Sequence, residues 1–195
     1  MLTKSDRTRQ HIIEQSATLF NTKGYAATSM ADILEATQLA KGGVYGHFTS
    51  KEAIAIEAFE YSYNLLMTAI KSKTSAANGA RNKLFAILSF YKNYTIAPLV
   101  PGGCILLNTA VDADDNIPFL KEKAKRALGE MLGALQRIIQ MGIDNNEFDK
   151  KVNAKKEAEL FFALIEGGIM MAKLNDEPAM LNRMLDHLKH NIQHW

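Results

Sequence analysis

Lys41, Tyr45, His47 and Lys51 are basic or hydrogen-bond-donating side chains that lie close together in the sequence. They belong to a segment, 28–51, that reads as a capped short helix, a turn, a second short helix and a fresh cap. This order is typical of a helix-turn-helix, whose second helix can lie in the major groove of DNA. Both lysines stand at helix starts and can reach phosphates, and the phenol and imidazole can donate to the same backbone. The pattern predicts contact with duplex DNA.

Capping signals indicate how this segment would be held. Ser29 and Asp32 have the spacing of a capping box, in which a hydroxyl and a carboxylate each bond an early backbone amide. Thr49 and Glu52 repeat that spacing before the following helix. Ser29 could instead contact a phosphate, and the sequence leaves its two roles open.

Apolar residues recur at helical spacing along the rest of the chain, and no segment has the pattern of a strand. The expected fold is all-α with about nine helices, in which a small domain, 1–50, is joined by a long helix to a larger helical domain, 51–195. The expected helices run from about Lys4 to Thr22, from Met30 past Leu34, from Lys41 to Phe48, from after Thr49 through Ile70, from Leu84 to Tyr91, from Cys104 to Val111, from Pro118 to about Asp144, from Asn153 to about Leu174, and from Pro178 to Ile192.

The charge of the 195-residue chain is unevenly distributed. Its net charge is +2, and through Lys51 there are already six lysines and arginines against four acidic residues. One end that faces nucleic acid on a neutral body is expected from this distribution. The longest apolar stretch, 160–172, falls short of the roughly 20 residues that a spanning helix needs, and the N-terminus has no apolar signal region. These features predict a cytoplasmic protein.

The N-terminal quarter resembles the TetR family of bacterial transcriptional regulators. Two departures lie in the turn: Gln38 stands where the family usually has glycine, and Ala40 where it usually has serine or threonine. We therefore expect the recognition helix to be less well capped than in relatives, with Gly43 and Gly46 offering fewer side chains to bases. The resemblance rests on Gly24-Tyr25, Thr28-Ser29-Met30, Asp32-Ile33, Lys41-Gly42, Tyr45, His47-Phe48 and Ser50-Lys51-Glu52.

This resemblance implies a ligand-responsive repressor that binds a palindromic operator as a homodimer and is released by a small-molecule inducer or an electrophile. Residues 1–50 would form a three-helix DNA-binding domain, and residues 51–195 a ligand-binding and dimerisation domain. The two recognition helices would lie about 34–36 Å apart, or a multiple of that distance. The implied DNA-contacting residues are Ser29, Lys41, Gly42, Gly43, Tyr45, His47 and Lys51.

The same resemblance implies two further sets of residues, and for both sets the alternative is plain intramolecular core. The candidates for lining a ligand pocket are Phe59, Tyr63, Tyr91, Tyr94, Cys104, Asn108, Phe162 and Met170. The candidates for a four-helix interface with a second subunit are Leu160, Phe161, Leu164, Ile165, Ile169, Leu181, Met184 and Leu188.

Cys104 is the only cysteine and cannot form an internal disulfide. It follows Gly102 and Gly103 and opens a helix, where the local field favours the thiolate. Together with a lysine such as Lys173, it resembles the electrophile- and oxidant-sensing members of the family. An inert, buried cysteine is the alternative.

Three histidines, His187, His190 and His194, share one helix face and could bind a metal, or could simply be exposed near a helix C-terminus. We predict no metal site, no cofactor and no catalysis, since no phosphate-binding loop, nucleophile elbow or paired-carboxylate motif is found. The rival function is a helical small-molecule-binding protein that has lost specific DNA binding.

Overall fold

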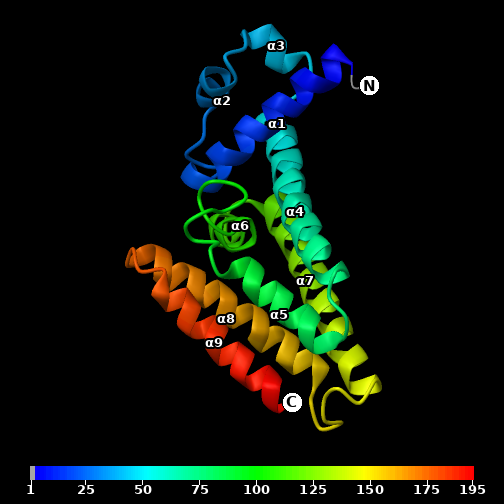
Figure 1. Cartoon of the computed structure of the whole chain (residues 1–195). Coiled ribbons are helices and arrows are strands. Elements are labelled where there is room, and N and C mark those ends of the chain that lie inside the picture. Colours follow the sequence, from blue (N-terminus) through cyan, green and yellow to red (C-terminus); the bar gives the residue numbers. More distant parts are fainter. Residues whose placement is uncertain (1–2) are drawn as a thin grey trace. The chain divides into compact units, whose positions relative to one another are not determined.

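The computed structural model describes residues 3–195, and every regular element among them is a helix (Figure 1). Within this described range no helix combines the length and apolar character needed to cross a bilayer. The predicted all-α fold with about nine helices is confirmed. The helices are α1 (Lys4–Lys23), α2 (Met30–Thr37), α3 (Lys41–Tyr45), α4 (Lys51–Ser75), α5 (Ala80–Tyr91), α6 (Ile105–Ala113), α7 (Pro118–Asp144), α8 (Ala154–Leu174) and α9 (Ala179–His194).

The chain forms two compact units, and their boundary is not a single point in the sequence. The first unit holds the residues up to Leu65 together with Leu99–Lys125, and the second holds Leu66–Pro98 together with Arg126–Trp195. The first unit thus contains α6 as well as the three N-terminal helices, whereas the sequence predicts a division near residue 50.

A small apolar core holds the N-terminal helices. Ile12 of α1, Ile33 of α2 and Val44 of α3 are each fully buried, and Phe48 and Ile54 belong to the same cluster. Burial of one such side chain stabilises the fold by about 1.5–3 kcal/mol. Isolated helices shorter than about 12 residues are marginal in water, so this core is what maintains the five-residue α3.

In the second unit, α8 and α9 form an antiparallel pair that continues onto α5 (Figure 1). Gly168 permits the close approach of α8 to α9, because a Cβ atom there would lie 2.9 Å from Leu181 Cδ1. One face of α9, formed by Leu181, Leu185, Leu188 and Ile192, is buried in this packing.

Candidate nucleic-acid interface

The capping box of α2 forms as predicted. The Asp32 amide donates to Ser29 Oγ over 3.1 Å, and the Ser29 amide donates to Asp32 Oδ2 over 2.7 Å. Lys23 adds a 2.8 Å ion pair to Asp32. Its bond, followed by those from Ser29, holds the pKa of Asp32 well below the ordinary 3.8. The Ser29 hydroxyl also donates to Asp32 over 2.6 Å, so its proton is already used and the structure favours capping over phosphate contact.

The turn after α2 adopts a left-handed conformation without glycine. Gln38 has φ 56° and ψ 28°, the left-handed conformation that a glycine adopts without strain. Its side-chain amide donates to the Glu35 carbonyl over 2.6 Å, which satisfies one of the last carbonyls of α2.

α3 presents a polar side outward from the core. Val44 is fully buried, while Tyr45 is 42% exposed and Lys41 is exposed with its Nζ 5.6 Å from the Tyr45 ring centre. Gly42 is also exposed, and a Cβ atom added to it would meet nothing within 4 Å. The two side chains and the open backbone at Gly42 therefore form one contiguous polar end that DNA can approach. Gly43 and His47 are half-buried beside it.

The recognition helix is shorter than predicted, because it ends at Tyr45 rather than Phe48. Ala40 at its N-cap makes no side-chain bond, as the departure from the family pattern predicts. Gly46 follows the last helical residue and has the low helix propensity that favours an early end.

Lys51 is engaged within the domain. Its Nζ donates to the carbonyls of Tyr25 and Thr28, each over 2.9 Å, and lies 4.0 Å from the centre of the Tyr25 ring. Burial, followed by the charge of Glu52, raises the pKa of the Tyr25 phenol. These contacts fix the start of α4 to the turn between α1 and α2. These contacts give Lys51 a positioning role, and its phosphate contact stays a prediction.

The start of α4 is capped by a different residue from the predicted one. The Ala53 amide donates to Ser50 Oγ over 3.1 Å, so Ser50 rather than Thr49 supplies the capping hydroxyl. A one-residue shift is within the ordinary uncertainty of helix boundaries.

Two asparagines join α1 to the segment that leads into α6. Asn21 is 4% exposed, and its amide donates to the carbonyls of Pro101 over 2.9 Å and Gly103 over 3.1 Å. The Asn108 amide donates to Asn21 Oδ1 over 2.9 Å, to the Asn21 carbonyl over 3.1 Å and to the Gly102 carbonyl over 3.0 Å. Asn108 was predicted to line a ligand pocket, whereas its amide is used in this α1–α6 link.

The backbone around this link requires glycine. Gly102 has φ +112°, and a Cβ atom there would lie 2.4 Å from the Asn21 carbonyl oxygen. A second tie comes from Asp112 of α6, whose Oδ2 accepts from the Tyr25 amide over 2.6 Å. The helix-turn-helix and α6 are thus bonded at two places within the first unit.

The remaining predicted pocket residues are mostly buried aromatics. Phe59 and Tyr63 stack with ring centres 6.2 Å apart in the first unit, and Tyr91 and Tyr94 lie 5.2 Å apart in the second. Phe59 and Asn108 line a cavity of about 20 Å³, which has room for a water molecule and not for an inducer. Phe162 is buried.

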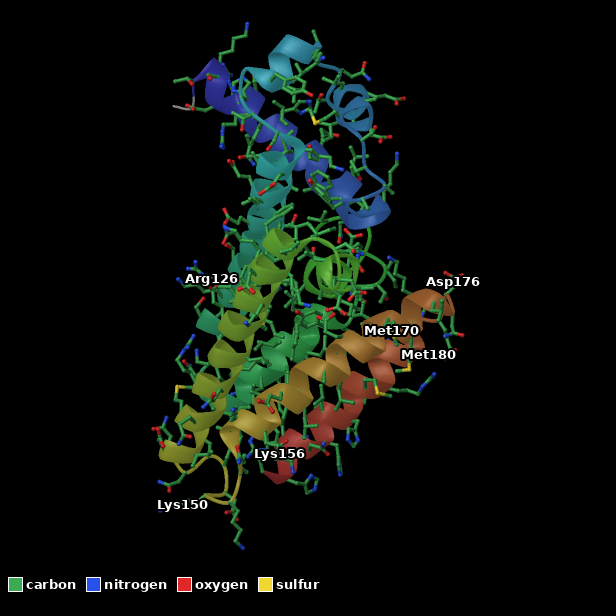
Figure 2. All side chains as sticks on the ribbon, turned by 180° about the vertical axis from the view of Figure 1, so that it is seen from behind. Arg126, Lys150, Lys156, Met170, Asp176 and Met180 are labelled. Carbon is green, nitrogen blue, oxygen red and sulfur yellow. The ribbon has the colours of Figure 1, made fainter. Side chains whose placement is uncertain are left out.

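Met170 does not line an internal pocket, because it is 53% exposed on α8 (Figure 2). Its side chain lies on the exposed face of α8, which also carries Leu160 and Leu174, rather than on the buried face of the helix. The prediction of Met170 as a pocket residue is therefore corrected.

The predicted interface residues separate into two groups. Leu160 is 46% exposed, and Leu164 and Met184 are half-buried, so these three are available to a second subunit. The other five lie in the core of their own subunit, which is the alternative that the sequence left open: Phe161, Ile165, Ile169, Leu181 and Leu188.

Cys104 is 1% exposed and occupies the N-cap position of α6, and Lys173 is exposed near the end of α8. The three C-terminal histidines are exposed, with the rings of His190 and His194 4.3 Å apart. Over residues 3–195 no group of histidine, cysteine and acidic side chains is arranged to hold a metal ion.

Sequence reasoning missed Asn21 and Asp112. Asn21 did carry a signal, since it continues the apolar face of Ile13 and Ala17 at helical spacing. A polar residue on such a face is expected to have a specific partner. Asp112 carried no such signal, because acidic residues are common near the ends of short helices.

Known proteins with the same architecture are bacterial regulators. The model described as "Bacterial regulatory proteins, tetR family" matches residues 12–58, and that of the "Tetracyclin repressor-like, C-terminal domain" matches residues 80–188, more than half of the chain. The HTH-type transcriptional repressor DhaR of Mycobacterium sp. (strain GP1) is 25% identical over 172 residues, 87% of this chain and 85% of that protein.

Two solved structures are similar over nearly the whole chain. A TetR-family transcriptional regulator from Cytophaga hutchinsonii is 39% identical with a TM-score of 0.90, and a TetR transcriptional regulator from Chloroflexus aurantiacus J-10-FL is 34% identical with a TM-score of 0.94. Each comparison covers 98% of this chain and 96% of the other. The chain, with its capped α2, its left-handed turn and its short α3, is a helix-turn-helix transcriptional regulator that belongs to the TetR family.

Proposed function

We propose that the protein is a transcriptional repressor that acts in the bacterial cytoplasm as a homodimer and leaves its operator when a small molecule or an electrophile acts on its C-terminal helices. The observation that carries the DNA contact is the exposed end of α3, where Lys41 and Tyr45 stand out beside the open backbone of Gly42. The relative DhaR, which is named a repressor, supports the sign of regulation.

Contact to bases is expected to be limited. Lys41 and Tyr45 offer charge and a hydroxyl donor, which suit phosphate oxygens and fix the register of the helix on the duplex. Gly42 and Gly43 offer only backbone, so they permit close approach without reading a base edge. Specificity then depends on His47, on the paired half-sites and on the shape of the DNA.

A homodimer is supported by an apolar stripe on the outer face of α8. Its residues recur at intervals of three and four, which is the spacing of a helix seam that packs against another helix. Met170 is 53% exposed, Leu174 is 81% exposed, and Figure 2 shows Met170 on α8 and Met180 on the neighbouring α9, near the turn marked by Asp176. The stripe consists of Leu160, Ala163, Gly167, Met170 and Leu174.

A single glycine substitution tests the dimer without disturbing the subunit. Gly167 lies in the middle of the stripe, and a Cβ atom there would meet nothing within 4 Å. Gly167→Arg should therefore fold but place a charge in the interface, giving a monomer in sedimentation velocity and no operator shift. Gly129→Arg on α7 is the matched control, since that glycine is also helical and open. A Gly167→Arg protein that stays dimeric and binds DNA would exclude this interface.

DNA binding is tested with duplexes from the region upstream of the protein's own gene. We expect a preferred, near-palindromic site, binding of one dimer, and binding that weakens steeply with salt. Equal affinity for random competitor would favour the rival function, a helical ligand-binding protein without specific DNA binding. We assign no catalytic role.

Release by an electrophile is proposed to start at Cys104. The thiol would add across the double bond of N-ethylmaleimide, forming a carbon–sulfur bond while its proton ends on the adjacent carbon. Cys104 directly follows Gly103, whose carbonyl accepts from Asn21, so the adduct would form next to the α1–α6 link.

The thiol proposal is tested by gel shift with one variant. Cys104→Ser should bind the operator with unchanged affinity and no longer respond to N-ethylmaleimide. Equal release from the wild type and Cys104→Ser would assign the response to another group.

A further inference from the structure

A groove between α5 and α9 has the features of a small-ligand site. Its volume is about 460 Å³, within the range of about 300–1,000 Å³ usual for ligand pockets. It lies wholly inside the second unit. Four lining residues come from α5 and its end, and four from α9: Phe85, Leu88, Ser89, Lys92, Asn182, Leu185, Asp186 and Lys189.

One polar atom of a residue that lines the groove lacks a partner. Asn182 Oδ1 is buried and accepts no hydrogen bond from any group within residues 3–195. An unpaired buried acceptor costs about 1–3 kcal/mol, so such an atom needs an explanation. Turning the Asn182 amide toward the groove would let a ligand that carries an N–H or O–H donor supply the missing bond.

The other lining groups define the rest of the ligand. Leu88 and Leu185 are buried and provide an apolar floor. Lys189 Nζ lies 5.7 Å from the Phe85 ring centre, and with Lys92 it gives two ammonium groups against the single carboxylate of Asp186. The excess of one positive charge fits an anion with one negative charge.

The groove lies on a face of α9 that the proposed dimer leaves open. The inference rests on the proposed function only in that the groove must stay uncovered in the homodimer. At about 100° per residue, Asn182, Leu185 and Lys189 project roughly opposite to Met184 and Asn191. Met184 neighbours Gly168 of α8, the helix that carries the apolar stripe. A partner docked on the stripe would therefore not cover the groove.

We propose that this groove binds small aromatic monoanions that carry a hydrogen-bond donor on the ring. The ring would lie on Leu88 and Leu185, the anionic group near Lys92 and Lys189, and the donor against Asn182 Oδ1.

Three probes of matched shape test these contacts by calorimetry without DNA. Indole-3-acetate has the ring, the carboxylate and the N–H, and should bind once per chain. Benzofuran-3-acetate lacks only the donor and should bind about fivefold more weakly or worse, since Asn182 then stays unpaired. Tryptamine reverses the charge and should not bind. Absence of indole-3-acetate binding at millimolar concentration would overturn the proposal, with the Asn182 oxygen then assigned to water.

Asn182→Leu is the decisive variant. It replaces the unpaired amide with an apolar side chain of similar size, so its melting temperature should not fall. It should bind indole-3-acetate and benzofuran-3-acetate equally, whereas a preserved preference for the indole would refute the role of Asn182. Lys92→Gln and Lys189→Gln should each weaken binding about two- to fivefold, and Lys155→Gln on α8 should not. Lysine variants that bind as the wild type does would also refute the site.

Because the assay needs neither DNA nor a dimer, its outcome is independent of the operator and sedimentation experiments. One site per chain is expected whether the protein sediments as a dimer or as a monomer.

Discussion

Lys51→Met is the substitution that best separates DNA contact from structural support. Methionine keeps much of the length of the lysine stem and removes the ammonium, which donates two bonds of 2.9 Å to the Tyr25 and Thr28 carbonyls. Hydrogen bonds to a charged donor contribute about 1.5–3 kcal/mol when well formed, and the partial exposure of Lys51 places each of these two at the low end or below. The cation–π contact with Tyr25 adds about 0.5–1 kcal/mol.

The expected loss is about 2–3 kcal/mol, which lowers the melting temperature of a chain of this length by roughly 4–12 °C. Circular dichroism melting measures that change. The salt dependence of operator binding should keep the slope of the wild type, since no phosphate contact is lost. An unchanged melting temperature together with a slope flattened by about 1.8 per dimer, one phosphate per subunit, would show that Lys51 binds DNA and that its bonds to Tyr25 and Thr28 carry little energy.

Three further substitutions, one of them with a matched control, give measurable outcomes. Lys41→Ala should flatten the salt slope of operator binding by about 1.8 per dimer without a change in melting temperature, and an unchanged slope would remove this lysine from the interface. Asp32→Asn tests the depressed pKa: the carboxylate stabilises the fold above its unfolded pKa near 3.8, and this contribution is lost as pH falls through the lower folded value. Urea titrations should therefore show the wild type more stable than Asp32→Asn at pH 7 and the difference shrinking below about pH 4, and a pH-independent difference would contradict the cause given. Gly102→Ala should lower the free energy of unfolding by about 2–4 kcal/mol through strain and overlap with the Asn21 carbonyl, whereas Gly129→Ala, in open space on α7, should raise it by up to about 1 kcal/mol.

The parts of this fold that sequence predicts are those determined by local chemistry. The Ser29–Asp32 cap, the buried side of α2 and the weak cap at Ala40 each depend on residues within one helical turn. The early end of α3 was missed because the apolar spacing of Val44 and Phe48 continues past Gly46, and the Phe48 amide still donates to the Val44 carbonyl over 3.1 Å although the regular helix has ended.

The roles of the candidate DNA-contacting and interface residues depend more on contacts between residues far apart in the sequence. Prediction from the sequence was weaker for these roles. Lys51 has the position of a phosphate ligand, yet its bonds are to carbonyls 26 and 23 residues away. On α8, Phe161 and Ile165 face inward and Leu160 faces outward, although all three are apolar. Periodicity shows that such a helix has more than one apolar face, and it does not show which face a second subunit would cover.

The buried amide of Asn21 has a practical consequence for engineering. A chimeric regulator could be made by exchanging DNA-binding domains at residue 50. This exchange would separate the Asn21 side chain from the carbonyls of Pro101 and Gly103 and from Asn108, and would leave an unpaired amide inside the junction. A chimera that keeps its stability should instead carry the segment that leads into α6, and α6 itself, together with the DNA-binding domain. The transferable DNA-binding module of this protein is therefore discontinuous in sequence.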